Sequence, residues 1–410
     1  MEAERIELNE RARKEGTDYP KKRMPYFEVE RFLEDRIAIA LVGPRGTGKT
    51  IILKQLLAKH KNSFFIALDA DPVVPDLFET AKELSEKGIK LLFLDEVHTQ
   101  PRFDRVLKKI SDFLPIKTVF TSSSSISLAQ FTADLSRRVR TVFCNPFSFW
   151  EYLLFNKNME FPRLSFSELL ELPSSRKFYP NVMKAERFFK SYLQGGSYPF
   201  ASGIDDPLPL FRNILETIIA RDLVLTGRAT PEEAGEIRRM MQFIGSSPAE
   251  GISYSSISQN TGITKYRSEK YSVLLEQAFV LMRVLPKGTN ITKEPKILIA
   301  PPYRLLFNPI EASIGSLRED FFVQSMQSLG YETRYLKSLR GEKIPDYLVQ
   351  GAVFEIGGIS KSVLQFKGFS AKKRLILTDP GSMDESRRPL FFAGMLTEQE
   401  AKPSAFRKTI

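Results

Sequence analysis

Residues Gly43–Thr50, with the sequence GPRGTGKT, match the pattern G-x-x-x-x-G-K-[ST] at every fixed position. The preceding run IAIALVG (37–43) is short and apolar, as in a buried strand, and TIILKQLLAKH (50–60) has the composition of a helix. A strand, a glycine-rich turn and a helix in this order are the context that a phosphate-binding loop requires. The segment therefore predicts an α/β fold with a nucleotide site at this turn.

Each part of this loop has a physical role in holding phosphate. Glycines let backbone N–H groups close around the phosphates, and the start of the following helix favours an anion. Lys49 is expected to reach the β- and γ-phosphates, and the Thr50 hydroxyl to ligate Mg²⁺. The expected ligands are ATP and Mg²⁺, and the residues expected to bind them are Gly43, Pro44, Arg45, Gly46, Thr47, Gly48, Lys49, Thr50 and Ile51.

Two acids follow a second apolar strand, KLLFLDEV (90–97). In a parallel sheet, the residues that follow a strand lie at the edge where ligands bind. We expect Asp95 to position Mg²⁺ and Glu96 to polarise the attacking water as a general base.

Hydroxyl side chains end the next predicted strand, KTVFTSSS (117–124). Thr121 or Ser122 could sense the γ-phosphate or orient the water, and Ser122 is the candidate that we assign to catalysis. The alternative is a serine-rich loop that caps the next helix.

Arginines gather at Arg137, Arg138 and Arg140, after the segment TADLS (132–136). An arginine at a subunit boundary could stabilise the charge on a transferred phosphoryl group, and Arg137 is the preferred candidate. A solvated basic face, or a surface that pairs with acids, explains the cluster equally well. The sequence leaves the oligomeric state open.

Composition limits the rest of the chain. Its 410 residues, of which 42% are hydrophobic, predict two to four domains with real cores. The charged N-terminus and the absence of a long apolar run predict a cytoplasmic protein without a membrane partner. A single cysteine, Cys144, predicts a buried strand thiol, and only two histidines, His60 and His98, argue against a zinc site.

Basic residues exceed acidic ones by 11, which is compatible with a nucleic-acid partner. Residues 253–286 have the rhythm of a helix-turn-helix followed by a hairpin, with Thr261 and Gly262 at the turn. The second helix, 265–276, carries Lys265, Tyr266, Arg267 and Lys270, which could contact DNA. The alternative is a packing module with a solvated polar face.

These segments together resemble the archaeal and bacterial AAA-type ATPases that join an N-terminal P-loop domain to a C-terminal domain of uncharacterised function. The matching stretches are GPRGTGKT, LLFLDEVH, FTSSSSISL, RRVRTVFCNPFSFWEYL, YLQGGSYPF and IIARDLV. The resemblance covers most of residues 37–360, and NPFSFWEYL and the pair GGSYPF and RDL are its most specific parts.

The resemblance implies an α/β fold class: a five-stranded, AAA-type parallel sheet between helices, then a helical and winged-helix region, then a restriction-endonuclease-like α/β domain. Four segments are therefore expected. They are a solvated helical arm (1–36), the P-loop ATPase domain (37–183), the helical and winged-helix domain (184–308) and the nuclease-like domain (309–410).

A nuclease of that fold has a helix acid, a second acid, and an acid-x-Lys on neighbouring strands, which together hold Mg²⁺ and position water. The corresponding residues here are Glu319, Asp346 and Glu355. Gly357 stands where the lysine is expected, although Lys361 or Lys367 could substitute. The resemblance therefore implies a degenerate domain used for binding or packing.

The function expected from these features is ATP binding and hydrolysis that rearranges the following domains, on DNA. One alternative is a nucleotide-gated switch with little turnover. A second is a metal-dependent nuclease driven by an ATPase. Glu96 favours turnover, and Gly357 counts against the nuclease.

Overall fold

A computed structural model describes residues 2–69, 76–123, 137–171, 178–225, 227–288, 294–336, 344–361, 366, 371 and 373–397. The chain forms two compact units, Met1–Pro146 and Phe147–Ile410, and each is described by itself. Ser124, the TADLS segment and Lys367 lie outside the described residues.

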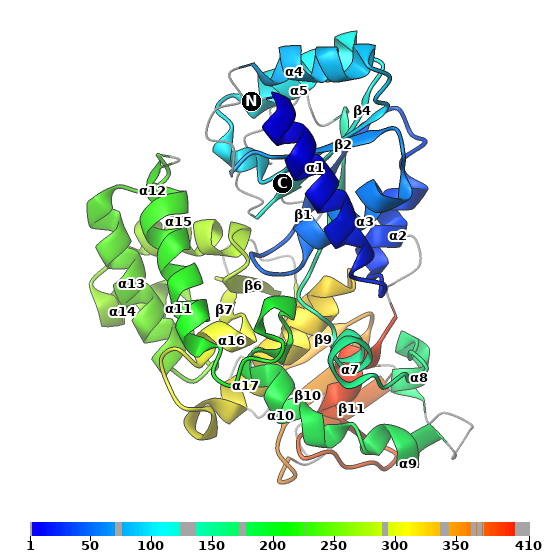
Figure 1. Ribbon diagram of the computed structural model, residues 1–410. Coiled ribbons are helices and arrows are strands. Elements are labelled where there is room, and N and C mark those ends of the chain that lie inside the picture. The colour runs from blue at the N-terminus through cyan, green and yellow to red at the C-terminus, as the bar shows by residue number, and fades with distance from the viewer. Residues whose placement is uncertain are drawn as a thin grey trace. The chain divides into compact units, whose positions relative to one another are not determined.

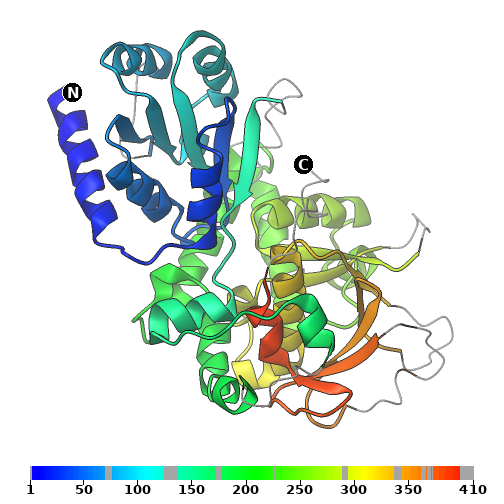
Figure 2. The same ribbon diagram turned by 90° about the vertical axis from the view of Figure 1, so that its right-hand side faces the viewer.

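The first unit is built on a sheet of five parallel strands with the order β2-β3-β4-β1-β5 (Figure 2). The strands are β1 (Ala38–Val42), β2 (Ser63–Ala67), β3 (Leu91–Asp95), β4 (Lys117–Ser122) and β5 (Val139–Phe143). β1, β3 and β4 are buried almost throughout, as the continuous apolar runs predict for strands covered on both faces. Because β4 lies between β1 and β3, the carboxyl ends of these three strands lie side by side.

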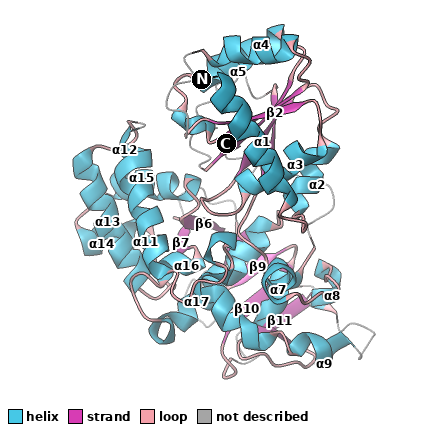
Figure 3. Cartoon of the chain, viewed as in Figure 1, coloured by secondary structure: helices cyan, strands magenta, loops and turns pink. Residues whose placement is uncertain are grey.

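Helices flank this sheet (Figures 1 and 3). They are α1 (Glu2–Thr17), α2 (Met24–Arg31), α3 (Lys49–Lys59), α4 (Leu77–Glu86) and α5 (Phe103–Phe113). Ile52, Leu53 and Leu56 of α3 pack with Ile39 and Leu41 of β1 in one buried core. This packing fixes the first turn of α3, which begins with Lys49 and Thr50, the last two residues of the phosphate loop.

The N-terminal arm is helical, but the expectation that it is solvated is wrong. α1 lies along α3, where Ala12 is buried and Asn9 Oδ1 accepts a hydrogen bond of 2.9 Å from the Phe65 N–H of β2. In α2, Tyr26 and Val29 are fully buried, three residues apart on one helical face. The arm is therefore an integral layer of the first unit.

The second unit contains many helices, several of them short. The α-helices are α7 (Phe149–Lys157), α8 (Phe166–Leu170), α9 (Phe178–Met183), α10 (Phe189–Ser191), α11 (Leu208–Thr217), α12 (Leu223–Leu225), α13 (Pro231–Ser246), α14 (Tyr254–Thr261), α15 (Lys265–Gln277), α16 (Pro301–Arg304) and α17 (Ile310–Ser328). Two π-helical turns are also present, η3 (Tyr192–Gly196) and η5 (Ile218–Asp222). Further 3₁₀ turns are η2 (Glu186–Phe188), η4 (Pro199–Ala201) and η7 (Leu390–Met395).

A seven-stranded sheet runs through the second unit in the order β12-β11-β10-β9-β8-β6-β7. Its strands are β6 (Leu281–Pro286), β7 (Lys296–Ile299), β8 (Thr333–Tyr335), β9 (Tyr347–Val349), β10 (Ala352–Gly357), β11 (Lys373–Thr378) and β12 (Arg387–Pro389). The hairpin β6–β7 follows α15, as expected, but β6 also pairs with β8. The hairpin and the C-terminal strands therefore belong to one sheet, although a domain boundary was expected between them at residue 308.

An aromatic core joins segments of the second unit that are far apart in the sequence. Phe149 of α7 makes edge contacts with Tyr192 of η3 and Phe391 of η7, with ring centroids 5.3 and 5.6 Å apart. The Tyr192 hydroxyl donates a 2.8 Å hydrogen bond to the Phe147 carbonyl. The aromatic part of NPFSFWEYL, from Phe147 onward, thus meets the YLQGGSYPF segment inside this unit. The expected ATPase segment extends to residue 183, and the four-segment division stays a prediction.

No described helix has the length and the apolar surface that a membrane crossing requires.

Candidate nucleotide site

The phosphate loop connects β1 to α3 through two glycines with left-handed backbone angles. Gly46 and Gly48 have φ of 81° and 87°, a region that side chains with a Cβ rarely adopt. Gly43 has a steric role, because a Cβ there would lie 2.0 Å from the Cys144 carbonyl oxygen. The loop can therefore turn closely enough to present its backbone N–H groups.

Lys49 begins α3, and its side chain is almost fully buried. Its ammonium donates hydrogen bonds of 2.8 and 2.9 Å to the carbonyls of Gly43 and Pro44. Burial lowers the pKa of Lys49, an effect that the carboxylates of Glu96 and Asp95 oppose. A phosphate group at the loop would compete with the two carbonyls for this ammonium.

Asp95 and Glu96 lie at the carboxyl end of β3, and Thr121 of β4 connects them. The Thr121 hydroxyl donates to Asp95 Oδ1 and accepts a 2.9 Å hydrogen bond from the Glu96 N–H. Burial raises the pKa of Asp95, and hydrogen bonds from Thr121 and Thr50 oppose that rise. The Asp95 carboxylate and the Thr50 hydroxyl are oxygen donors of the kind that Mg²⁺ prefers, and they lie close enough to interact.

Glu96 has the left-handed backbone angles φ 52° and ψ 52° and is followed by the 3₁₀ turn η1 (Val97–Thr99). The turn places His98 Nδ1 3.0 Å from Glu96 Oε2. Burial by itself would raise the pKa of the Glu96 carboxyl, but contact with His98 and the charges of Lys49 and Arg45 outweigh it and lower that pKa to about 2. Glu96 is therefore a carboxylate, as a general base must be.

Arg23, from the segment before α2, supports the phosphate loop from behind. Its buried guanidinium donates to the Thr47 carbonyl at 2.7 Å and to the Asn145 carbonyl at 2.9 Å. It also lies 3.4 Å from the sulfur of Cys144, which is a buried free thiol, as expected. The sequence analysis missed Arg23, although the spacing of the apolar residues Tyr26 and Val29 was a signal that this segment packs inside.

The remaining candidates differ in their surroundings. Ser122 is buried at the end of β4, and its carbonyl accepts a hydrogen bond from the Gly43 N–H at 3.3 Å. Arg138 pairs with Asp112 and Arg140 with Asp35, each at 3.0 Å. Arg137 is exposed and makes no ion pair with any described residue. Two of the three arginines thus pair with acids, and the finger role of Arg137 stays a prediction.

Three acids named from the sequence lie together in the second unit, on α17, before β9 and on β10. Burial raises the pKa of Asp346 to about 7, and the charges of Glu319 and Glu355 add to this rise. Lys296 pairs with Glu319 at 2.5 Å, and Lys361 pairs with Glu355. No group of three or more His, Cys, Asp or Glu side chains in the described ranges is arranged to hold a metal ion.

Lys361 occupies the space that the missing lysine would fill. A Cβ at Gly357 would lie 2.6 Å from the Lys361 side chain, whose ammonium contacts Glu355. Of the two substitutes considered from the sequence, Lys361 thus reaches the acids, whereas Lys367 lies outside the described residues.

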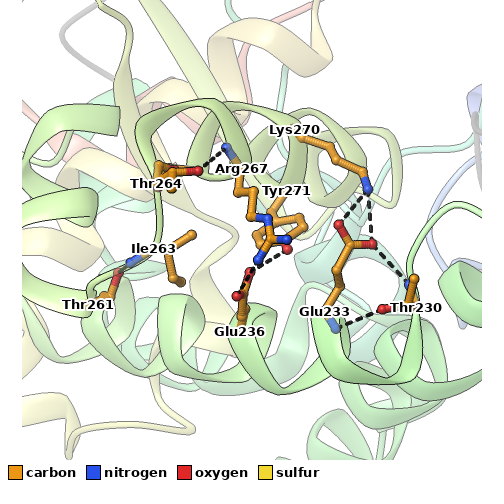
Figure 4. A network of polar contacts seen from close by, with 10 residues as sticks. Thr230, Glu233, Glu236, Thr261, Ile263, Thr264, Arg267, Lys270 and Tyr271 are labelled. Carbon is orange, nitrogen blue, oxygen red and sulfur yellow. Dashed lines mark hydrogen bonds and ion pairs between the residues drawn. The ribbon is translucent and has the colours of Figure 1, made fainter.

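Basic residues of α15 pair with acids of the same unit (Figure 4). Arg267 and Lys270 each lie 2.7 Å from a carboxylate of α13, Glu236 and Glu233 respectively. Lys265 lies 2.5 Å from Glu294. These cations therefore have acidic partners within the chain.

Comparison with known proteins gives a family match for most of the first unit and the first residues of the second. Residues 35–153 match the family described as the AAA domain. The chain is 29% identical to the uncharacterized protein MJ1637 of Methanocaldococcus jannaschii, over 67% of this chain and 63% of that protein. It is 26% identical to MJ1544 of the same organism, over 45% and 41%. The chain thus spans less than two thirds of the length of these relatives.

Solved structures give more distant likenesses. The Walker-type ATPase PABY2304 of Pyrococcus abyssi is 15% identical, with a TM-score of 0.40, over 69% of this chain and 94% of that one. AMPPCP-bound DnaA from Aquifex aeolicus is 15% identical, with a TM-score of 0.25, over 62% and 87%. The family match rather than these likenesses supports the assignment of an AAA-type P-loop domain to the first unit.

Proposed function

We propose that this protein binds ATP with Mg²⁺ and hydrolyses it at the site formed by the phosphate loop, Asp95, Glu96 and Thr121. The observation that carries the proposal is the position of Glu96. An ionised carboxylate lies at the end of β3, next to the buried pair of Asp95 and Thr121. A site that only binds nucleotide has no need of a base at this place.

Each residue has a distinct task in this proposal. The loop N–H groups and Lys49 hold the phosphates, and the Asp95 carboxylate and Thr50 hydroxyl supply oxygen ligands for Mg²⁺, which when bound offsets negative charge on the phosphates. Glu96 accepts a proton from the attacking water. Thr121 keeps the two acids at their separate positions, through one hydrogen bond to each residue.

Comparison of wild type with Glu96→Gln tests the proposal. The amide keeps the size of the side chain but is a far weaker base, so we expect ATP binding to remain and kcat to fall by about 100-fold or more. A tight ATP complex without turnover in the wild type would instead support the nucleotide-gated switch. Equal hydrolysis by both proteins would remove Glu96 as the base.

The finer parts of the function are proposals of the same kind. Hydrolysis would change the arrangement of the following domains, and an oligomer would let Arg137 act as a finger. Arg137→Ala and Arg137→Lys, assayed over a range of protein concentrations, test the finger. A role in trans predicts that specific activity rises with concentration in the wild type only.

A second candidate function rests on Lys361. Its side chain lies beside Gly357, where the family has a lysine, and its ammonium contacts Glu355. Together with the nearby acids Glu319 and Asp346, this supports a metal-dependent nuclease as the second candidate. The ion pairs of Glu319 and Glu355 would have to open before these acids could hold a cation. Plasmid nicking with Mg²⁺ or Mn²⁺ that disappears in Glu355→Ala and Lys361→Ala would support it, and nicking that survives both would end it.

DNA is the macromolecular partner that the excess of 11 basic residues favours. A winged-helix role for α14, α15 and the β6–β7 hairpin would make α15 the contact helix. The ion pairs of Lys265, Arg267 and Lys270 count against that helix, because each pair would have to break before its cation could neutralise a phosphate.

A further inference from the structure

His98 contacts the side chain that we propose as the general base. Its Nδ1 lies 3.0 Å from Glu96 Oε2, and both side chains are largely buried, with exposed fractions of 19% and 16%. Neither Nδ1 of His98 nor Oε2 of Glu96 makes a hydrogen bond of regular geometry with any group in the described part of the chain. Their contact with each other is therefore the polar interaction that is open to both atoms. Burial of two unsatisfied polar atoms would otherwise be unfavourable.

The backbone is shaped to bring these two side chains together. Glu96 adopts left-handed angles, which are unusual for a residue other than glycine. The Thr99 N–H and hydroxyl both donate to the Glu96 carbonyl, at 3.1 and 2.9 Å, and so close the turn. This turn directs His98 back onto the carboxylate two residues earlier.

Other charged groups lie near Glu96. Lys49 donates to the carbonyls of Gly43 and Pro44, and Asp95 has the same charge as Glu96. Arg45 acts through its charge. His98 Nδ1, at 3.0 Å, is in direct polar contact with the carboxylate.

We propose that His98 is a positioning residue, which donates its Nδ1–H to Glu96 and keeps the carboxylate oriented toward the attacking water. The inference rests on the proposed role of Glu96. A free glutamate side chain samples several rotamers, and only some of them place the oxygen within reach of the water. The histidine selects among these rotamers and does not itself touch the substrate.

Three substitutions separate this role from a structural one. In asparagine the amide nitrogen is attached to Cγ, as Nδ1 is in histidine, so His98→Asn keeps a donor at the same place. His98→Gln moves the donor outward to the place of Nε2, and His98→Ala removes it. We expect His98→Ala and His98→Gln to lower kcat by about 10-fold or more, which corresponds to at least about 1.4 kcal/mol.

We expect the substitutions of His98 to change kcat and to leave ATP binding nearly unchanged. The KM for ATP and the dissociation constant of a fluorescent ATP analogue should change by no more than about twofold, because the proposed role of His98 is to orient Glu96 and not to bind the phosphates. His98→Asn should recover most of the wild-type kcat. In a Glu96→Gln background, His98→Ala should have no further effect on kcat.

Several results would overturn the role of His98. They are an unchanged or increased kcat in His98→Ala, an equal loss in His98→Asn and His98→Ala, or a rise in KM alone. If the proposed function itself is wrong, wild type will be inactive or Glu96→Gln will be fully active. These results differ from the ones that overturn the role of His98. An active wild type and an inactive Glu96→Gln together with a normal His98→Ala would reject only the positioning role.

Discussion

At the scale of single residues, the site depends on hydroxyl and imidazole groups that connect its acids. The sequence predicted Asp95 and Glu96 because they directly follow an apolar strand, which is a local pattern. It named Thr121 and Ser122 as alternatives and assigned Ser122 to catalysis, whereas the hydroxyl that connects Asp95 and Glu96 is that of Thr121, a contact that depends on the strand order placing β4 beside β3. His98 entered the sequence analysis only in the argument against zinc, since its contact with Glu96 depends on the left-handed turn.

Thr121→Val tests the connection between the two acids. Valine has nearly the same shape but has no hydroxyl, so Asp95 loses a donor and the Glu96 N–H loses an acceptor. Each loss costs about 1–3 kcal/mol in a buried site. We expect kcat to fall by about 10-fold or more and the ATP dissociation constant to change little. Steady-state kinetics and ATP titration measure this, with Thr121→Ser as the control that keeps the hydroxyl; a wild-type kcat in Thr121→Val would contradict it.

Asp346 gives a prediction about pH. Its pKa is raised to about 7 in the folded protein, above the value of 3.8 for an unperturbed carboxyl, so the folded state holds a proton that the unfolded state has lost between these pH values. Stability should therefore fall as pH rises from about 4 to about 7. Asp346→Asn cannot ionise, so it should raise the thermal unfolding temperature at pH 8 more than at pH 5. An equal change at both pH values would contradict the raised pKa.

At the scale of elements, apolar runs were good predictors of the buried strands, and the N-terminal arm was not predicted correctly. The first sheet is parallel and covered on both faces, so β1, β3 and β4 could be read from continuous hydrophobic stretches. The arm is rich in charged residues, which favoured a solvated helix. Its contacts are made by a minority of residues, among them Asn9, Arg13 and Arg23, whose partners lie far along the chain.

Arg23 tests whether the arm supports the phosphate loop. Arg23→Ala removes the donor to the buried carbonyl of Thr47 and the partly buried carbonyl of Asn145. A buried acceptor left unpaired costs about 1–3 kcal/mol. We expect weaker ATP binding, by about 10-fold, together with a lower unfolding temperature. Arg23→Lys should be intermediate, because a single ammonium does not reproduce the fork of a guanidinium. A lower unfolding temperature with unchanged ATP affinity would show that Arg23 stabilises the unit without shaping the loop.

At the scale of the whole molecule, the sequence patterns identified elements but not their groupings. The NPFSFWEYL corner follows β5 directly, which favoured its inclusion in the ATPase segment, yet its aromatic side chains pack with η3 and η7 of the second unit. Likewise, the β6–β7 hairpin joins the C-terminal sheet through β6 and β8. Such partners are decided by packing between distant segments, which a single sequence does not display.

The excess of 11 basic residues is also a property of the whole molecule, and it leads to a prediction about DNA. If α15 contacts DNA, Glu233 and Glu236 compete with phosphates for Lys270 and Arg267. The double substitution Glu233→Gln and Glu236→Gln should then tighten non-specific DNA binding and steepen its dependence on salt. Each cation released to a phosphate adds about 0.9 to the slope of log K against log salt concentration.

The control is Glu216→Gln, which frees Arg238 of α13 from an exposed ion pair that involves no cation of α15. The affinities of wild type, the double variant and Glu216→Gln for a fluorescent DNA duplex are measured by titration at several salt concentrations. Equal slopes in wild type and the double variant would show that α15 does not face the phosphates, because freeing its two cations would then change no contact with DNA. A wild-type affinity that does not respond to salt at all would exclude phosphate neutralisation as the use of the positive charge.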